Sequence, residues 1–308
     1  MVETVQVNSP RIDDKIERHQ IAVCNLCGHR ETAPYCPENG RGLVQCQHCE
    51  LVYVGSQPDA DELHALYSES YFHNDESGEV GYSDYIGDEI NIRKTSRKRL
   101  KHLSQFITGG RMMDVGCAMG FFIDEASKQG FDVEGLDVSQ FATEYVEKHF
   151  GHEVHTGSLL VQDFESSAYD MVTMYDVIEH VPDPKAYMEK VADMLKPGGI
   201  YELATPDVGS FPAKLAGSHW IGYKLADEHV YYFSVATLKK MLGDAGFDVL
   251  AVRHIGKFVT MKLFLDRLGF YVPWLSKPLE AISGLLKLDE RAFYVNPHDI
   301  VAVTARKR

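Results

Sequence analysis

The sequence predicts an α/β protein built on a parallel β-sheet and preceded by a small cysteine-rich module. From residue 111 onward, short apolar runs alternate with stretches of helical periodicity, which is typical of βαβ units. A glycine-bearing turn, Asp114-Val-Gly116-Cys-Ala-Met-Gly120, joins the first of these runs to a helix. The module is predicted by two identical pairs, Cys24-x-x-Cys27 and Cys46-x-x-Cys49. A chain of 308 residues has room for one large domain and one small one.

The four cysteines have the spacing of a tetrahedral zinc site, because each short pair presents two thiolates from one tight turn. Cys36 and His48 lie close in sequence and could replace a ligand, although the two pairs already complete a site. Disulfides would need an oxidising compartment, and the first twenty residues lack the apolar core of a signal peptide. We therefore expect Zn2+ in a closed structural site, in a cytoplasmic protein. The expected ligands are Cys24, Cys27, Cys46 and Cys49.

The net charge of −14 argues against nonspecific binding to nucleic acid or to anionic lipid, which depends on Lys and Arg. One basic run departs from this average, and its six residues have helical spacing. We interpret it as the solvated face of a helix rather than a phosphate-binding patch. The run consists of Arg93, Lys94, Arg97, Lys98, Arg99 and Lys101.

Seven strands are expected, each a short apolar run bounded by polar or turn residues. They cover 111–115, 132–137, 153–156, 171–175, 200–204, 247–254 and 300–305. Helical periodicity places helices between them at 120–129, 139–149, 183–195 and 235–245.

Composition divides the chain into four parts. A polar tail (1–20) precedes the cysteine module (21–55), an aromatic and helical connector (56–110) and the α/β domain (111–308). The α/β domain contains two insertions, 207–233 and 257–291. Pro273 and Pro278 interrupt the second insertion, which should form two short amphipathic helices. These helices could serve as a lid, as the face of a homodimer, or as a surface that meets a lipid-linked substrate.

The glycine turn and a second acidic residue point to a nucleoside cofactor. The turn opens a helix whose N-terminal amides face the edge of the sheet, and small residues let a ligand approach the backbone. Asp137 ends the second strand, twenty-one residues after Gly116, where a carboxylate can accept hydrogen bonds from both ribose hydroxyls. The turn lacks the G-x-G-x-x-G pattern of dinucleotide binders, which disfavours an NAD-dependent oxidoreductase.

These residues resemble the class I S-adenosylmethionine-dependent methyltransferases over about 111–255. The resemblance rests on Met113–Gly120, on Gly135-Leu-Asp137-Val-Ser139, on the segment from Tyr169 to Val181, and on Leu195-Lys-Pro-Gly-Gly199. Together with the cysteines it implies a Rossmann-like, seven-stranded methyltransferase sheet, with an N-terminal zinc ribbon and a helical insertion before the last strand. Ala118 stands where this family usually has glycine, and we expect cofactor binding to tolerate the extra methyl group.

The resemblance also implies roles for individual residues toward S-adenosylmethionine. The turn would pass beside the methionine part of the cofactor, Asp137 would hold the ribose, and the residues after the third strand would approach adenine. Leu159 and Val138 could equally belong to the core. The aromatic connector would cover the cofactor or else form a seam with the cysteine module. The candidate cofactor residues are Asp114, Gly116, Cys117, Ala118, Gly120, Asp137, Val138, Ser158, Leu159, Tyr175, Asp176, Tyr82 and Tyr85.

Methyl transfer is an in-line displacement, so the protein must align the acceptor and, for a hydroxyl or acidic C–H, remove its proton. His229 is the candidate base, because a histidine beside a carboxylate can accept a proton near neutral pH. Glu228 and Tyr223 complete the candidate catalytic set. A packed core histidine is the alternative, and Glu179-His180 is expected to be a structural pair.

Glu228-His229 and the cysteine module together resemble part of the C-methyltransferases of nucleotide-linked deoxysugars. The expected function is methylation of a small molecule, in particular a sugar or a precursor in polysaccharide or secondary metabolism, at oxygen or carbon. A protein or RNA methyltransferase docked through the zinc module, and a noncatalytic cofactor-binding scaffold, are the alternatives.

Overall fold

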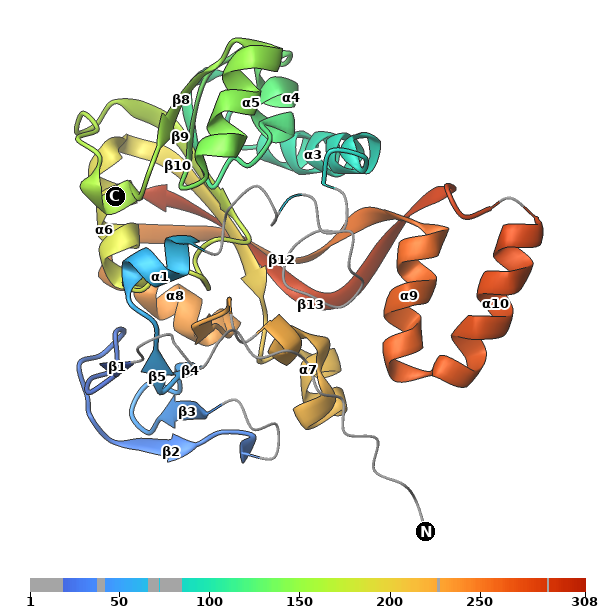
Figure 1. The fold of residues 1–308 in the computed structure, drawn as a ribbon. Coiled ribbons are helices and arrows are strands. Elements are labelled where there is room, and N and C mark those ends of the chain that lie inside the picture. Colours follow the sequence, from blue (N-terminus) through green and yellow to red (C-terminus); the bar gives the residue numbers. More distant parts are fainter. Residues whose placement is uncertain (1–18, 38–41, 66–71, 73–84, 226–227, 287) are drawn as a thin grey trace.

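A computed structural model describes residues 19–37, 42–65, 72, 85–225, 228–286 and 288–308. Its centre is a seven-stranded sheet in the order β12-β13-β10-β9-β6-β7-β8 (Figure 1). β13 runs antiparallel to both of its neighbours, and the other neighbouring pairs are parallel. The strands are β6 (Gly110–Val115), β7 (Phe131–Asp137), β8 (Glu153–Thr156), β9 (Tyr169–Tyr175), β10 (Leu195–Pro206), β12 (Phe247–Thr260) and β13 (Ala292–Lys307). All seven expected strands are therefore confirmed, and β10, β12 and β13 are longer than expected.

Helices cover both faces of the sheet. Successive side chains of a strand point to opposite faces, and apolar residues of these strands lie on both faces. Met112, Met171 and Ile200 pack with the helices α3, α4 and α5. Met113, Val172 and Leu203 pack with α6 and α8 on the other face. The expected helices are confirmed to within two residues at each end. They are α4 (Phe121–Ser127), α5 (Gln140–Phe150), α6 (Pro184–Met194) and α8 (Val235–Asp244). A further helix, α3 (Glu89–Leu103), lies in the connector.

The strand order reverses between β6 and β9. From β6 the chain continues to β7 and β8 on one side, and β9 then pairs with β6 on the other side. A ligand of an open α/β sheet binds outside the carboxyl ends of the strands at such a reversal. The glycine turn after β6 and the acidic end of β7 both lie at this edge, so the topology places the predicted cofactor residues where a cofactor can bind.

The cysteine module forms a small antiparallel sheet, and one strand of the α/β domain pairs with it. β2 (Thr32–Pro34), β3 (Leu43–Cys46) and β4 (Val52–Val54) pair antiparallel, and β11 (Tyr231–Tyr232) adds a fourth strand beside β4. β1 (His19–Gln20) pairs with β5 (Ser56–Gln57), and α1 (Ala60–Ala65) follows. This pairing between β4 and β11 was not expected from the sequence.

The segment between β10 and α8 consists of short elements. They are α7 (Phe211–Ala216), the 3-10 turns η3 (Gly217–His219) and η4 (Ile221–Leu225), and β11. A further 3-10 turn, η2 (Leu159–Val161), follows β8.

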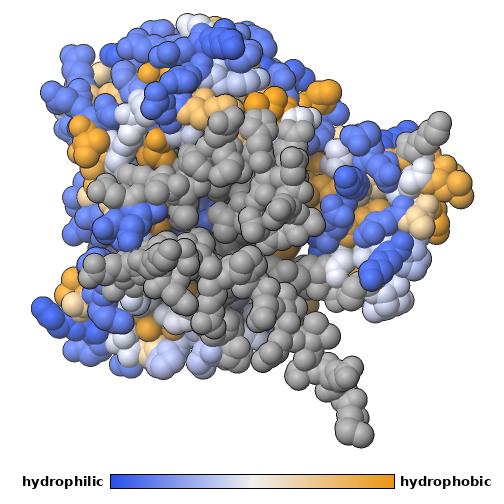
Figure 2. Space-filling model, viewed as in Figure 1, coloured by the Kyte–Doolittle hydropathy of each residue, from blue (hydrophilic) through white to orange (hydrophobic). Residues whose placement is uncertain are grey.

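β12 and β13 continue past the sheet as a hairpin that carries α9 (Met261–Tyr271) and α10 (Pro273–Leu285) away from the rest of the molecule (Figure 1). The two expected helices of this insertion are thus confirmed. Apolar side chains remain exposed on α10, among them Trp274 at 75% and Leu285 at 83% exposure, and orange residues mark the arm in Figure 2. Among the described residues, no helix combines the length and the apolar composition needed to cross a membrane.

The interpretation of the basic run as a solvated helix face holds for Arg97, Lys98 and Lys101, which are exposed. It is wrong for Arg93, Lys94 and Arg99, which are partly buried. Arg93 makes ion pairs with Glu89, Asp124 and Glu125, and Arg97 with Glu125. Other cations of α3 lie over aromatic rings. Lys94, Lys98 and Arg99 lie over Phe258, Tyr294 and Tyr175, respectively. The ion pairs therefore fasten α3 to α4, since buried carboxylates need a charged partner. The cation–ring contacts fasten α3 to β9 and to the β12–β13 hairpin.

Candidate functional site

The glycine turn after β6 bends through three left-handed residues. The φ angles of Gly116, Ala118 and Gly120 are 79°, 47° and 73°. A Cβ on Gly116 would lie 2.2 Å from Cγ2 of Val177, so only glycine lets the turn pass this close to the chain after β9. Ala118 adopts a conformation that L-residues other than glycine rarely accept.

Asp137 holds this turn. Its Oδ2 accepts a hydrogen bond of 2.8 Å from the amide of Ala118, and its Oδ1 accepts one of 2.9 Å from the amide of Ser139. The side chain is buried, and burial raises the pKa of Asp137 although the backbone amides oppose this shift. Each carboxylate oxygen has two acceptor positions, so capacity for two ribose hydroxyls remains. The residue therefore suits the predicted cofactor role.

Asp114 lies beneath the turn and is only 4% exposed. Its Oδ1 accepts a hydrogen bond of 2.6 Å from the hydroxyl of Thr173, which joins β6 to β9. Burial raises the pKa of Asp114 to about 7. Cys117, in the turn, is buried and packs against Gly135. A Cβ added at Gly135 would lie 2.8 Å from the Cys117 sulfur. Both residues shape the turn from within the sheet.

Of the residues predicted to border adenine, Val138 and Ser158 are partly exposed, whereas Leu159 is buried. The amide of Gly157 donates to the carbonyl of Asp137, which brings the turn after β8 beside β7. Ser158 is part-buried and hydrogen-bonds to the Tyr187 hydroxyl at 2.7 Å, and Val138 is partly exposed at the strand end. Leu159, by contrast, is 1% exposed and packs in the main core cluster.

The aromatic connector packs against the helices that flank the glycine turn. Tyr85 stacks on Phe121, the first residue of α4, at 6.0 Å between ring centroids, and Phe72 meets Tyr85 edge-on. Phe72 also joins the cluster that contains Met119. The described part of the connector therefore lies beside the predicted cofactor crevice. Tyr82, Tyr67 and Tyr71 lie outside the described residues.

Tyr175 ends β9 with its hydroxyl turned into the sheet. The hydroxyl donates to Oε1 of Glu202 at 2.9 Å, and the guanidinium of Arg99 lies 4.0 Å from the ring centroid. Burial raises the pKa of Tyr175 well above its ordinary value.

Asp176, the next residue, is left-handed at φ 56° and forms an ion pair with Lys257 at 2.8 Å. Burial alone would raise the pKa of Asp176, but Lys257 and Arg99 outweigh burial and hold it below the ordinary value. Sequence reasoning missed Lys257 as a site residue. The signal that could have found it is Gly256 inside a strand, because such a glycine often marks a bulge that redirects a side chain.

A buried group of ionisable side chains follows Asp176. Glu179 and His229 are 1% and 4% exposed, and the rings of His180 and His229 meet edge-on with their centroids 4.5 Å apart. Nδ1 of His180 donates to the carbonyl of Glu228 at 3.1 Å. Burial lowers the pKa of His180 to about 4 and lowers that of His229 well below its ordinary value. Both imidazoles are therefore neutral at pH 7.

Glu179 carries the opposite shift, because burial and the charge of Asp176 raise its pKa to about 8. Its carboxylate oxygens have no hydrogen-bond partner within the described ranges, nor does Nδ1 of His229. Buried polar atoms of this kind are rare and often mark a functional site.

The other two candidate catalytic residues occupy different surroundings. Glu228 is 3% exposed and adjoins His229 in the chain. Tyr223 belongs to a separate aromatic cluster, where its hydroxyl donates to that of Tyr35 at 3.5 Å and its ring meets Trp220 edge-on. Tyr232 contacts both Tyr223 and His229, with ring centroids 5.4 and 6.1 Å away. The structure thus brings His180, rather than Tyr223, against His229.

The four cysteines converge in the module. Cys24 and Cys49 are 3.5 Å apart at sulfur, as are Cys27 and Cys46, and all four sulfurs lie within 4.8 Å of one another. A zinc ion with four thiolates at about 2.3 Å has sulfurs about 3.8 Å apart. The two pairs also share one turn geometry, in which the fifth residue, Gly28 or Glu50, is left-handed and its amide donates to the first cysteine's carbonyl. The cluster can hold a tetrahedral metal ion.

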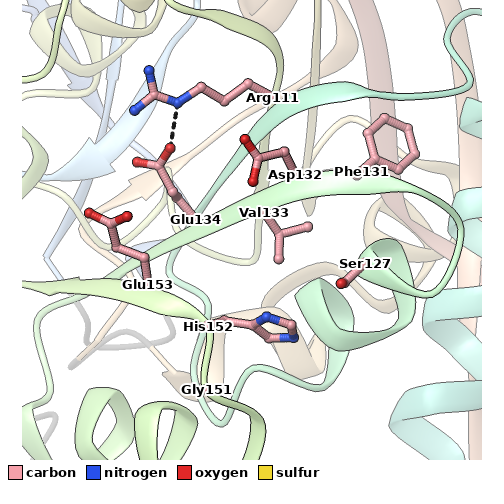
Figure 3. A pocket seen from close by; sticks show the side chains of 9 residues that line it. All are labelled: Arg111, Ser127, Phe131, Asp132, Val133, Glu134, Gly151, His152 and Glu153. Atoms are coloured by element: carbon pink, nitrogen blue, oxygen red, sulfur yellow. Dashed lines mark hydrogen bonds and ion pairs between the residues drawn. The ribbon is translucent and has the colours of Figure 1, made fainter.

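A polar hollow of about 480 Å³ lies at the other end of the sheet. Figure 3 shows the side chains that line it. It is lined at the amino ends of β6, β7 and β8 by residues that include Arg111, Glu134 and Glu153. Arg111 and Glu134 form an ion pair there at 2.5 Å. The hollow thus lies at the opposite edge of the sheet from the glycine turn and the Asp137 end of β7.

A protein-family model described as a methyltransferase domain matches residues 88–252, more than half of the chain. The chain belongs to this methyltransferase domain family. The match includes the glycine turn, Asp137 and the end of β9. The protein is a SAM-dependent methyltransferase.

The methyltransferase is similar to proteins named ubiquinone biosynthesis O-methyltransferase. It is 26% identical to that of Psychrobacter arcticus over an aligned length of 188 residues, and the alignment covers 56% of this chain and 73% of the relative. The Pasteurella multocida relative is 28% identical over 140 residues (40% and 58%), and that of Coxiella burnetii is 32% identical over 108 residues (33% and 46%). The matches thus cover 46% to 73% of these relatives' own length.

Solved structures of low sequence identity share the fold of the methyltransferase. A SAM-dependent methyltransferase from Archaeoglobus fulgidus has a TM-score of 0.50 at 16% identity, covering 72% of this chain and 99% of that one. A chain in the Haloferax volcanii complex between the Trm112 methyltransferase activator and a methyltransferase has a TM-score of 0.51 at 15% identity, covering 72% and 94%.

Proposed function

We propose that this methyltransferase transfers a methyl group to a hydroxyl of a small molecule, with His229 as the general base. The observation that carries the proposal is the neutral, buried imidazole of His229 beside the carboxyl end of β9. A base for methyl transfer must be unprotonated at neutral pH and must lie where acceptor and cofactor meet. The contact between Gly116 and Val177 supports this placement, because it joins the glycine turn to the chain that leads from β9 to Glu179 and His180.

The residues present fit S-adenosylmethionine, which supplies a methyl carbon activated by positively charged sulfur. Asp137 retains acceptor capacity for a ribose, and the left-handed turn at Gly116, Ala118 and Gly120 exposes backbone at the edge of the sheet. Val138 and Ser158 flank Asp137 and would border adenine. Asp176 would lie toward the reacting centre, where Lys257 compensates its charge.

His229 would act by taking the acceptor proton. Burial lowers the pKa of His229, so the imidazole stays unprotonated at neutral pH. Because Nδ1 has no partner within the described part of the chain, it is available for a proton or for a hydrogen bond to substrate. His180, fixed by its bond to the Glu228 carbonyl, would hold the His229 ring from the side.

The cysteine cluster is proposed to bind one Zn2+. The support is the close approach of four sulfurs and the matching turns of the two pairs. Four protein ligands leave no position for substrate, so the role of the metal is structural.

For the acceptor, the names of the relatives favour an oxygen nucleophile on a small molecule. These relatives give no support to a sugar acceptor, which rests on the pairing of Glu228-His229 with the cysteine module. We therefore propose a hydroxyl acceptor first, and methylation of a nucleotide-linked sugar as the second candidate.

The test begins with binding. Calorimetric titration of the purified protein with S-adenosylhomocysteine should give micromolar affinity, and NAD titrated in parallel should give none. An acceptor screen of catechols, other phenols and nucleotide-linked sugars then follows methyl transfer. His229→Gln should lower turnover at least about a hundredfold. Its affinity for S-adenosylhomocysteine should stay within about threefold of the wild-type value. Unchanged turnover in this variant would reject His229 as the base.

A further inference from the structure

We propose that the four-cysteine module is a positioning element for His229, acting through the strand that β11 adds to the module's sheet. The inference rests on the proposed roles of His229 and of the cysteine cluster. It assigns the module a task inside the candidate active site, beyond that of a separately folded front end.

The first observation is the main-chain connection between the module and the residues after His229. β11 pairs antiparallel with β4, with Tyr231 opposite Tyr53 and Tyr232 opposite Val52. The carbonyl of Val230 accepts from the Val54 amide at 3.0 Å and from the Gln57 side-chain amide at 3.2 Å. His229 therefore directly precedes a segment whose hydrogen bonds come from the module.

The second observation is that the same segment is held from the opposite side by the chain after β9. The carbonyl of Glu179 accepts from the amides of Val230 and Tyr231 at 2.9 and 3.1 Å. The Tyr231 hydroxyl donates to the carbonyl of Pro182. The segment is thus clamped between the module and the turn that carries Glu179 and His180, which fixes the approach of the His229 and His180 rings.

The third observation is that the cysteine turns themselves are part of this clamp. Asn25 lies inside the first pair, and its side-chain amide donates to Oδ1 of Asp183, the N-cap of α6, at 2.8 Å. The amide of Lys185 donates back to Asn25 at 3.0 Å. On the other side, β3 ends at Cys46 and pairs with β4, so the second cysteine turn is one strand away from β11.

These contacts make the order of the His229 segment depend on the order of the cysteine turns. The module is small and could not bury a sufficient core alone, so a metal ion is the expected source of its stability. Without the metal, β4 should lose its fixed partner strand β3, and β11 should lose β4. The glycine turn and Asp137 make none of these bonds, so cofactor affinity should survive.

The experiment uses the full-length protein with its zinc content measured before and after chelation. Amide hydrogen exchange is followed in the peptide spanning 228–233, and the His229 imidazole is followed by NMR, assigned with His229→Gln. We expect chelation to speed exchange at Val230 and Tyr231 at least about tenfold. Exposure to water should also move the pKa of His229 up toward the ordinary value of 6.5. Adding back one equivalent of Zn2+ should reverse both changes.

Two variants test the clamp without altering a cysteine. Asn25→Ala removes the bond to Asp183, and Gln57→Ala removes the side-chain bond to Val230. Each should speed exchange in 228–233 and shift the His229 signal while zinc stays bound. Gln47→Ala, at an exposed amide side chain of the same module, is the matched control and should change neither.

Cofactor affinity separates this inference from the proposed function. Binding of S-adenosylhomocysteine that persists after zinc is chelated, together with faster amide hydrogen exchange in 228–233, supports positioning of His229 by the module. Unchanged exchange and an unchanged His229 signal in the chelated protein and in both variants would overturn it. If the intact protein does not bind S-adenosylhomocysteine, the proposed cofactor is wrong. If it contains no zinc, the metal dependence is wrong, and Asn25→Ala then decides whether the module positions His229.

Discussion

The amide of Ala118 donates a 2.8 Å hydrogen bond to the carboxylate of Asp137, so the residue proposed to hold the ribose also holds the turn beside it. Replacement of Asp137 should therefore affect both the ligand contact and the shape of the crevice.

Asp137→Asn should weaken binding of S-adenosylhomocysteine at least about tenfold. The asparagine amide cannot accept from both backbone amides, because one of its two terminal atoms is a donor. Calorimetry measures the effect. Asp132→Asn, an exposed residue near the start of the same strand, is the control and should bind normally. Equal affinity for both variants would remove Asp137 from the cofactor site.

Ala118→Gly should stabilise the protein. A left-handed residue other than glycine costs about 1–2 kcal/mol, whereas glycine costs about 0.5–1 kcal/mol through the entropy of the unfolded chain. A gain of up to about 1.5 kcal/mol should therefore appear in urea unfolding. Ala126→Gly, in the right-handed helix α4, should destabilise by about 1 kcal/mol instead. A loss of stability in Ala118→Gly would show that the strain at φ 47° is offset locally.

Gly256→Ala should displace the β12–β13 hairpin. The ladder changes register between Ile255 and Lys257, and a Cβ on Gly256 would lie 1.8 Å from the Val295 carbonyl oxygen. We expect a loss of about 1–3 kcal/mol in unfolding free energy, together with loss of the Lys257–Asp176 ion pair.

The matched control for this substitution is Gly243→Ala. A Cβ on Gly243, inside α8, would meet no atom within 4 Å, so alanine there should stabilise by about 1 kcal/mol. If both variants had the same stability, the proposed steric role of Gly256 would be wrong.

Glu179→Gln should remove a pH dependence of stability. Folding raises the pKa of Glu179 from 4.5 to about 8, so the folded state keeps a proton that the unfolded chain releases between these values. Stability from this group is present below pH 4.5 and is lost as pH rises toward 8. The variant should match the wild type near pH 5 and exceed it by about 1 kcal/mol or more at pH 9.

Urea titrations at pH 5, 7 and 9 would measure this difference. Glu189→Gln, at a side chain that is 57% exposed on α6, should leave the pH profile of stability unchanged. Parallel wild-type and Glu179→Gln profiles would mean that Glu179 is ionised in the folded protein.

The sheet could be predicted from the sequence because its strands are short apolar runs separated by helical periodicity. The glycine turn and Asp137 lie at the ends of those runs, so topology alone brings them together. The extended ends of β12 and β13 were missed, because alternation stops at the register change beside Gly256 and the outer strands pair with each other away from the core.

The setting of His229 could not be predicted in the same way. β11 has two residues and pairs with a strand nearly 180 positions earlier, and nothing local in Tyr231-Tyr232 encodes that partner. Arg93 was misinterpreted for a related reason, since its partners Asp124 and Glu125 belong to another helix. Periodicity identifies a face, but the charges that it meets depend on tertiary structure.

The position of β13 between β10 and β12 sets the order in which the sheet can assemble. β12 precedes β13 in the chain, yet it joins the seven-stranded sheet only through β13. Until β13 inserts, β10 is an open edge that carries the apolar Leu203 and Ala204. Such an edge can pair with another chain. We therefore expect the slow, aggregation-prone stage of folding to end when the β12–β13 hairpin docks on β10.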